Sequence, residues 1–223
     1  MIADNLRDVT LRISRCCEKA GREPSSVKLV CVTKEAGMPQ IEEVLRLGVM
    51  DIGENRVQDA VSKYGAIAGR ANLHLIGHLQ TNKVKDAVKI SALIHSVDSL
   101  RLADKISQEA GKIGKTQDIL VQVNTSGEES KFGVAPDGAI NLFRKAVLYP
   151  NINILGLMTI APEAWDPDTV RPFFRRLREL RDELQGLKLT ARSLQLSMGM
   201  TGDLETAIEE GATIVRIGRA IFG

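Results

Sequence analysis

A lysine ends the first short apolar run of this 223-residue chain, and an arginine lies near the end of the last run. The first run is Lys28-Leu29-Val30-Cys31-Val32-Thr33-Lys34, and the last is Thr213-Ile214-Val215-Arg216-Ile217-Gly218. A lysine at the end of a buried strand is partly desolvated, which favours the neutral amine that forms a Schiff base with an aldehyde or ketone. The alternative for Lys34 is a surface lysine that extends past the rim into water.

A second group of residues is suited to hold an anion. Residues 197–203 read Ser-Met-Gly-Met-Thr-Gly-Asp and lead from an apolar run into a helical pattern. Small residues such as Ser197 and Gly199 allow backbone N–H groups to approach an anion closely. A plain capping turn would also explain the glycines and Thr201, so the pattern leaves both interpretations open.

Eight apolar runs alternate with stretches of helical periodicity along the chain. Continuous apolar runs of this kind are typical of parallel strands that are covered on both faces. A helical pattern over residues 6–20, ended by Gly21, precedes the first run. The alternation and the length predict an α/β fold, a (β/α)8 TIM barrel with an extra N-terminal helix, in a single domain over residues 1–223. We expect every strand except the last to be followed by a helix. The expected strands are residues 28–34, 49–54, 73–78, 93–97, 118–124, 152–160, 194–199 and 213–218.

The carboxyl ends of the strands form the functional face of such a barrel. Two longer connections, residues 125–135 and 161–168, should lie on the same face. Barrels often bind a phosphate between the loops after strands seven and eight, which here hold residues 197–203 and 216–219. An amine at strand one beside a phosphate site indicates a phosphorylated carbonyl ligand, of which pyridoxal 5′-phosphate is the prominent example. The polar residues expected at the strand ends are Lys34, Asn55, His78, Asn124, Thr159, Ser197 and Arg216.

Other residues compete for these roles. His74 and His78 would lie about 13 Å apart along one strand, too far to share a small ion, so we expect no metal site. His78 could donate a proton or play a hydrogen-bonded structural role, and His95 is expected to be structural. Lys83 and Lys131 are expected to be exposed ammonium groups and therefore weaker nucleophiles than Lys34, with Lys131 ordering its loop or pairing with an anion.

The composition excludes several classes of protein. The formal net charge of +2 comes from mixed charges, and aromatic residues make up only 4% of the chain, so nucleic acid is not an expected partner. Cys16, Cys17 and Cys31 lack the spacing of a metal site or a disulfide framework and are expected to be buried thiols. No run approaches the about 18 apolar residues of a membrane span, and the first residues do not resemble a signal peptide. We therefore expect a cytoplasmic protein that does not bind a membrane.

Several motifs together resemble the YggS/PROSC family of pyridoxal phosphate homeostasis proteins. The resemblance covers nearly the whole chain. It implies the barrel of fold-type III pyridoxal phosphate proteins, which is also the amino-terminal domain of alanine racemase. Thr33 and Thr81 stand where serine is common in the family, and both keep the hydroxyl group. The motifs are Val30-Cys31-Val32-Thr33-Lys34, Gly53-Glu54-Asn55-Arg56-Val57-Gln58, His74-Leu75-Ile76-Gly77-His78-Leu79-Gln80-Thr81-Asn82-Lys83, Gly156-Leu157-Met158, Ser197-Met198-Gly199-Met200 and Arg216-Ile217-Gly218.

The resemblance also implies roles for individual residues. Lys34 matches the lysine that carries the cofactor as an internal aldimine. Arg216 would face the pyridine nitrogen. Residues implied at the phosphate are Ser197, Gly199, and the backbone of Gly218 and Arg219, and those implied beside the ring are Asn55 and His78.

Three functions remain open at this point. The resemblance favours a protein that binds pyridoxal phosphate for vitamin B6 and amino-acid homeostasis without turnover, with apoenzymes or a regulatory protein as further partners. A racemase or decarboxylase would use the same cofactor, but racemisation needs a second acid/base group, commonly a tyrosine from an additional domain, and we expect Tyr64 and Tyr149 to lie away from the strand ends. A Schiff-base aldolase would need no cofactor. Without the dimer-forming extra domain, we expect a monomer.

Overall fold

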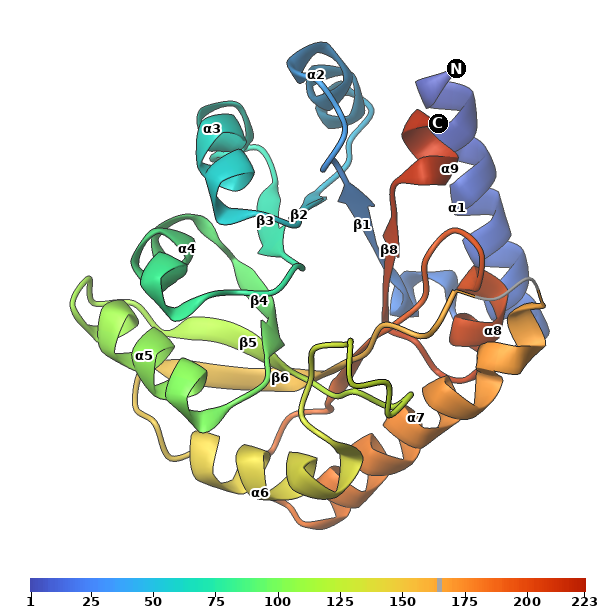
Figure 1. Cartoon of the computed structure of the whole chain (residues 1–223). Coiled ribbons are helices and arrows are strands. Elements are labelled where there is room, and N and C mark those ends of the chain that lie inside the picture. The colour runs from blue at the N-terminus through green and yellow to red at the C-terminus, as the bar shows by residue number, and fades with distance from the viewer. Residues whose placement is uncertain (164–165) are drawn as a thin grey trace.

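Eight parallel strands close into a barrel in the order β1-β2-β3-β4-β5-β6-β7-β8 (Figure 1). The computed structural model describes residues 1–163 and 166–223. The predicted fold class and all eight predicted strands are confirmed, although most strands end before the polar residues that follow them. The strands are β1 (Lys28–Val32), β2 (Asp51–Glu54), β3 (Asn72–Leu75), β4 (Leu93–Val97), β5 (Gln117–Gln122), β6 (Ile152–Met158), β7 (Gln195–Ser197) and β8 (Ile214–Ile217).

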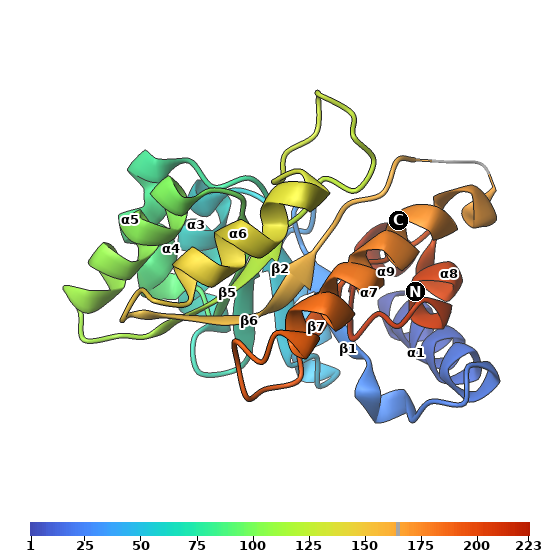
Figure 2. The same cartoon turned by 90° about the horizontal axis from the view of Figure 1, so that it is seen from below.

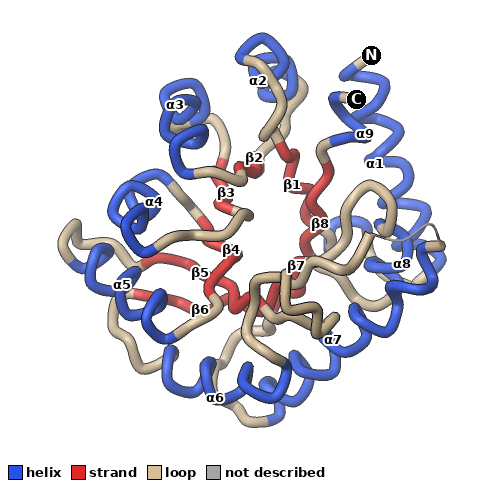
Figure 3. The backbone as a smooth tube through the Cα atoms, viewed as in Figure 1, coloured by secondary structure: helices blue, strands red, loops and turns tan. Residues whose placement is uncertain are grey.

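Helices surround this barrel on the outside (Figure 3). The expectation that no helix follows the last strand is wrong, because the chain turns at Gly218 into the short helix α9. The α-helices are α1 (Ile2–Lys19), α2 (Met38–Arg46), α3 (Val57–Ile67), α4 (Val84–Ile90), α5 (Leu100–Gly111), α6 (Pro136–Ala146), α7 (Arg171–Gly186), α8 (Leu204–Glu209) and α9 (Arg219–Phe222). Within the described part of the chain, short 3-10 helices lie at η1 (Pro24–Ser26), η2 (Thr81–Lys83) and η3 (Pro167–Val170).

Local sequence signals explain where the helices begin and end. The chain leaves α1 through Gly21, whose φ of 63° favours glycine, and it leaves α2 through Gly48 with a φ of 85°. Pro39 occupies the first turn of α2, where its missing N–H has no partner to lose. At α5 the hydroxyl of Ser99 accepts a hydrogen bond from the N–H of Leu102, as an N-cap residue does.

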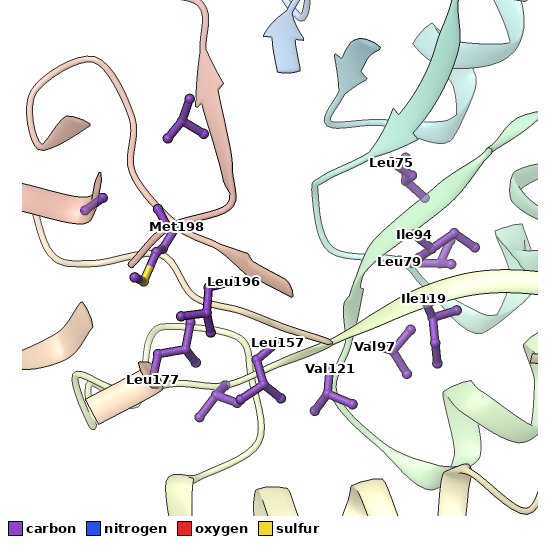
Figure 4. Packing of buried hydrophobic residues seen from close by; sticks show 14 of the residues in the cluster. Leu75, Leu79, Ile94, Val97, Ile119, Val121, Leu157, Leu177, Leu196 and Met198 are labelled. Carbon is purple, nitrogen blue, oxygen red and sulfur yellow. The ribbon is translucent and has the colours of Figure 1, made fainter. Parts of the chain in front are cut away.

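Apolar side chains form two layers, one outside and one inside the barrel. The outer layer lies between strands and helices, and Figure 4 shows Leu157, Leu177 and Leu196 among its members. The inner layer is much smaller and fills the barrel itself. It consists of the buried residues Val30, Leu93, Leu120, Met158 and Ile214, with the partly buried Leu155 packed against them.

The barrel interior also holds a line of polar side chains. Asp51 Oδ1 lies 2.9 Å from His74 Nε2, and His74 Nδ1 lies 2.9 Å from His95 Nε2. His95 Nδ1 in turn lies 2.9 Å from the hydroxyl of Ser197. Arg216 then donates from Nη1 to the same hydroxyl at 2.7 Å. All five residues are buried, so unpaired groups here would cost free energy, and each finds its partner within the line.

The loops that follow the strands lie on one side of the barrel. Figure 2 shows the loop after β5 and the described part of the loop after β6 projecting on the same side, as expected for the longer connections 125–135 and 161–168. Within the second loop, Ala164 and Trp165 lie outside the described residues. None of the described helices has the length and apolar character that crossing a membrane would require.

Two glycine substitutions should have opposite effects on stability. A Cβ atom at Gly156 would lie 2.0 Å from the carbonyl oxygen of Gln195, so Gly156→Ala should lower the free energy of unfolding by about 1–3 kcal/mol. Gly65 lies in the exposed part of α3 with nothing within 4 Å of the added atom, so Gly65→Ala should raise it by about 0.5–1 kcal/mol. Denaturant unfolding curves measure both values. Equal effects would show that the close approach of β6 to β7 does not require glycine.

Acid should destabilise the fold through His95. Burial, and then the nearby charges of Arg216 and Lys28, lower the pKa of His95 well below 6.5. The unfolded chain therefore binds a proton near pH 6.5 that folded His95 does not take up, so stability should fall as the pH drops below about 6.5, by up to about 1.4 kcal/mol per pH unit. Urea unfolding at pH 7.5 and pH 5.5 measures the slope, and His95→Phe should reduce it. An unchanged slope in the variant would contradict this assignment.

Candidate functional site

A cavity of about 410 Å³ opens where the carboxyl ends of β1 and β8 meet. The pairing of β8 with β1 closes the barrel, so the first and last apolar runs of the sequence lie side by side. The cavity lining is Val32, Lys34, Asn55, Ile76, Gly77, Ile160, Glu163, Met200, Thr201, Arg216, Gly218 and Arg219. The structure thus brings Lys34, Asn55, Arg216, Gly218 and Arg219 together, as the sequence predicted.

Lys34 lies two residues beyond the end of β1, at the rim of the cavity. Its side chain is 46% exposed, and its Nζ atom lies 3.3 Å from a carboxylate oxygen of Glu35. It is therefore less desolvated than its position after an apolar strand suggested. A half-exposed amine that lines a cavity is accessible to a carbonyl ligand, which a fully buried amine would not be.

Arg216 forms the floor of the cavity and is only 4% exposed. Its Nη1 atom donates to the Ser197 hydroxyl at 2.7 Å, and its Nη2 atom donates to the carbonyl oxygen of Thr159 at 2.9 Å. Burial lowers the pKa of Arg216 to about 10, which still leaves the guanidinium charged at neutral pH. Because a guanidinium carries five N–H groups, three remain after these two hydrogen bonds. The site therefore presents a fixed cation with spare donors.

Ser197 and Gly199 do not line the cavity. The Ser197 side chain is fully buried, and its hydroxyl contacts His95 and Arg216. Gly199 has a φ of 96°, and a Cβ atom there would lie 2.6 Å from the Cβ atom of Ala207. Gly199 is therefore required for the close packing of the loop after β7 against α8.

Thr201 supplies the hydroxyl that does reach the cavity, in the loop between β7 and α8. Its hydroxyl oxygen accepts a hydrogen bond of 3.4 Å from the N–H of Ala220, which links this loop to α9. Gly218 lies opposite, where a Cβ atom would approach the carbonyl oxygen of Val32 to 3.0 Å. The sequence left Thr201 open between a capping residue and part of an anion loop, and Thr201 was not among the residues expected at the phosphate. Its position two residues after Gly199 in the suspected anion loop was the signal that pointed to it.

The structure separates His78 from the cavity that holds Lys34. The ring of His78 stacks on Phe132 at 3.8 Å between centroids, and its Nδ1 atom lies 3.8 Å from a carboxylate oxygen of Asp98. Asn55 lines both this cavity and a neighbouring one of about 530 Å³ that includes His78, Arg56 and Lys83. His78 also lies beyond the end of β3, and not within the strand as expected.

Other groups considered from the sequence lie elsewhere. Lys131 pairs with Glu128 at 2.8 Å within the loop after β5, in agreement with a loop-ordering role, but its side chain is only 25% exposed, so the expectation of an exposed ammonium group is wrong. His95 is fully buried and hydrogen-bonded to Ser197, in agreement with the structural role expected for it. Among residues 1–163 and 166–223, no three His, Cys, Asp or Glu side chains are placed to hold a metal ion.

Residues 5–223 match the family described as "Alanine racemase, N-terminal domain". Proteins named "Pyridoxal phosphate homeostasis protein" are similar over nearly the whole chain. The one from Aquifex aeolicus is 47% identical over 221 residues, covering 99% of this chain and 96% of the relative. The one from Homo sapiens is 34% identical over 232 residues, covering 98% of this chain and 84% of the relative.

Solved structures are also similar to this chain over nearly its whole length. PipY of Synechococcus elongatus, described as a structure with PLP bound, superposes with a TM-score of 0.87 at 32% identity, with all of both chains covered. Alanine racemase from Clostridium difficile superposes with a TM-score of 0.79 at 16% identity, covering 99% of this chain and 56% of that one, which shows a shared fold. Sequence, fold and family match agree, and the chain belongs to the family of pyridoxal phosphate homeostasis proteins, built on the alanine racemase N-terminal domain.

Proposed function

We propose that the chain binds pyridoxal 5′-phosphate in the cavity at the carboxyl ends of β1 and β8. One observation carries the proposal: the amine of Lys34 and the buried cation of Arg216 line the same cavity. An aldehyde suits the amine, and a pyridine nitrogen suits a guanidinium donor. The name of the Aquifex aeolicus relative and the bound ligand of PipY support the same conclusion.

Lys34 would hold the ligand covalently through an imine formed with its aldehyde, with loss of water. The cofactor supplies an electron-withdrawing ring when bound. The chain's own residues would bind and orient it, with Lys34 at one end and the loops after β7 and β8 at the other. Asn55 would lie beside the ring, because it lines the cavity near Lys34.

The phosphate would lie between the loops after β7 and β8. Thr201 offers a hydroxyl there, Arg219 offers a charge, and Gly218 leaves room for close approach of the backbone. Arg219 is 70% exposed and paired with Glu163 at 3.1 Å, so screening by water should make its charge a minor contribution. We therefore assign the hydroxyl contact to Thr201 in place of Ser197, whose side chain does not reach the cavity.

We further propose that the bound ligand does not turn over amino acids. A guanidinium is a permanent cation that cannot take a proton from the pyridine nitrogen, so Arg216 would keep that nitrogen unprotonated and the ring a weak electron sink. Racemisation also needs a second acid/base group. Tyr64 lies in α3 and Tyr149 lies between α6 and β6, and neither lines the cavity.

The cellular role follows the same reasoning. A monomeric, cytoplasmic, single-domain chain that holds the cofactor without consuming it would buffer pyridoxal phosphate for vitamin B6 and amino-acid homeostasis. Apoenzymes that receive the cofactor, or a regulatory protein, are the partners that this role implies. A racemase or decarboxylase activity is the second candidate, since alanine racemase shares the fold.

Lys34→Ala should abolish covalent binding of the cofactor. Borohydride reduction of the wild type with pyridoxal phosphate should give a stable adduct, and peptide mapping should place it on Lys34. Lys131→Ala is the matched control and should retain the adduct, since Lys131 pairs with Glu128 in its own loop. An adduct on Lys131 or Lys83 in the wild type would contradict the assignment.

Thr201→Ala should weaken binding of the cofactor by about ten- to a hundredfold, since a hydrogen bond to a charged group contributes about 1.5–3 kcal/mol. Thr201→Ser keeps the hydroxyl and should bind nearly as the wild type does. Fluorescence titration with pyridoxal phosphate measures both affinities. Equal affinity of Thr201→Ala and the wild type would place the phosphate elsewhere.

Added amino acids should not be consumed. Incubation of the loaded protein with either enantiomer of alanine, followed by chiral chromatography, should leave the enantiomer ratio unchanged even where the absorbance spectrum shifts. Steady racemisation or decarboxylation by the wild type, lost in Lys34→Ala, would overturn the non-catalytic proposal and favour the enzyme.

A further inference from the structure

The polar line through the barrel connects its amino-terminal end to the floor of the ligand cavity. Asp51 is the first residue of β2, at the end of the barrel opposite the cavity. Arg216 lies on the cavity floor at the other end of the line. Between them lie His74 on β3, His95 on β4 and Ser197 on β7. The hydrogen bonds from Asp51 to His74, from His74 to His95 and from His95 to Ser197 are each 2.9 Å long between the heavy atoms. Nothing in the proposed chemistry of Lys34 and Thr201 requires these residues.

Each end of this line has a fixed hydrogen-bonding role. Arg216 can only donate. Burial alone would raise the pKa of Asp51, but hydrogen bonds from His74 and Asn72 and the charge of Lys28 outweigh it and lower the pKa below its ordinary value. Asp51 is therefore a carboxylate at neutral pH and can only accept. It accepts from Lys28 at 3.2 Å and from Asn72 at 3.1 Å, as well as from His74.

Two proton arrangements fit these ends, and they differ at Ser197. In the first, His74 and His95 are neutral and carry their protons on Nε2. The Ser197 hydroxyl then donates to His95 Nδ1, His95 Nε2 donates to His74 Nδ1, and His74 Nε2 donates to Asp51. In the second, either His74 or His95 is a cation, His95 carries a proton on Nδ1, and the Ser197 hydroxyl must find another acceptor. The arrangement of the two rings thus determines whether Ser197 has a free proton.

The first arrangement satisfies every buried group. Ser197 is fully buried, and its hydroxyl has hydrogen-bond contacts with His95 and Arg216. In the second arrangement both of those contacts donate to it, which leaves its own proton without an acceptor among them. The second arrangement also adds a cation to an interior that already holds the cation of Arg216 and, at its lower end, Lys28 beside the carboxylate of Asp51. The apolar layer around the line offers this charge no compensation.

We propose that Asp51, His74 and His95 form a one-way hydrogen-bond chain that commits the Ser197 hydroxyl to His95 and so holds Arg216 in place under the ligand. These three residues are positioning residues, and Ser197 acts through Arg216 and not on the phosphate. The effect on the ligand rests on the proposed function, whereas the proton arrangement does not.

The ligand-free protein gives the first test. Long-range proton–nitrogen correlation spectra of nitrogen-labelled protein at neutral pH distinguish ring nitrogens that carry a proton from those that do not. We expect both His74 and His95 to be neutral and protonated on Nε2. Asp51→Asn should lose this single arrangement. Asp118→Asn is the matched control, because Asp118 also lies near the start of a strand and accepts from an asparagine on the next strand, at 2.7 Å from Asn153.

Ligand affinity gives the second test, through a double-mutant cycle. His95→Phe and Ser197→Ala should each weaken binding of pyridoxal phosphate about tenfold, and the double variant should be no weaker than either single variant, because both remove the same link. His95→Asn should restore most of the affinity, since its side-chain oxygen can accept from Ser197. Binding of inorganic phosphate should change less than twofold in all four variants.

Each result has a definite meaning. Protonation of His95 on Nδ1, with either His74 or His95 doubly protonated, would overturn the chain and free the Ser197 hydroxyl for a ligand. Additive losses in the double variant, or a loss of inorganic phosphate binding in Ser197→Ala, would do the same by placing Ser197 on the phosphate. If the wild type does not bind pyridoxal phosphate, the proposed function fails, while the nitrogen spectra still decide the proton arrangement.

Discussion

A buried guanidinium inside the barrel is the interaction on which the site depends. Arg216 is 4% exposed, and a charge removed from water must be matched by hydrogen bonds. The structure supplies the Thr159 carbonyl on one side and the Ser197 hydroxyl on the other. Because Ser197 needs an acceptor in turn, the requirement extends through His95 and His74 to Asp51. One cation thus explains why a TIM barrel interior, usually filled by branched apolar residues, holds so many polar side chains.

A second buried group holds the strand that leads to Lys34. Glu54 at the end of β2 is fully buried and accepts hydrogen bonds from the Thr33 hydroxyl and from Lys63. Lys63 also donates to the carbonyl oxygen of Thr33 at 2.7 Å. Thr33 directly precedes Lys34, so these bonds tie the backbone next to the amine to β2 and α3. The amine is half-exposed at its tip, whereas its backbone attachment is held from two neighbouring elements.

The sequence predicted the elements far better than the contacts between polar side chains. Alternation of apolar runs and helical periodicity was enough for the barrel, because burial on both faces of a parallel strand constrains many residues at once. The helix α9 was missed, since four residues carry no periodic pattern. His78 was placed within a strand that ends at Leu75, because pairing with a neighbouring strand, and not hydrophobicity, decides where a strand stops.

The sequence by itself determined which residue types reach the carboxyl ends of the strands. Lys34 ends the first apolar run and Arg216 lies near the end of the last one, so both could be placed from the sequence. Closure of the barrel then brings the first and last strands together. Only the tertiary structure decided which hydroxyl faces the cavity. Ser197 and Thr201 are four residues apart, and both belong to a plausible anion loop, but strand pairing buries Ser197 against His95 while the following turn exposes Thr201. That choice depends on partners from strands far apart in the sequence, which no local pattern encodes.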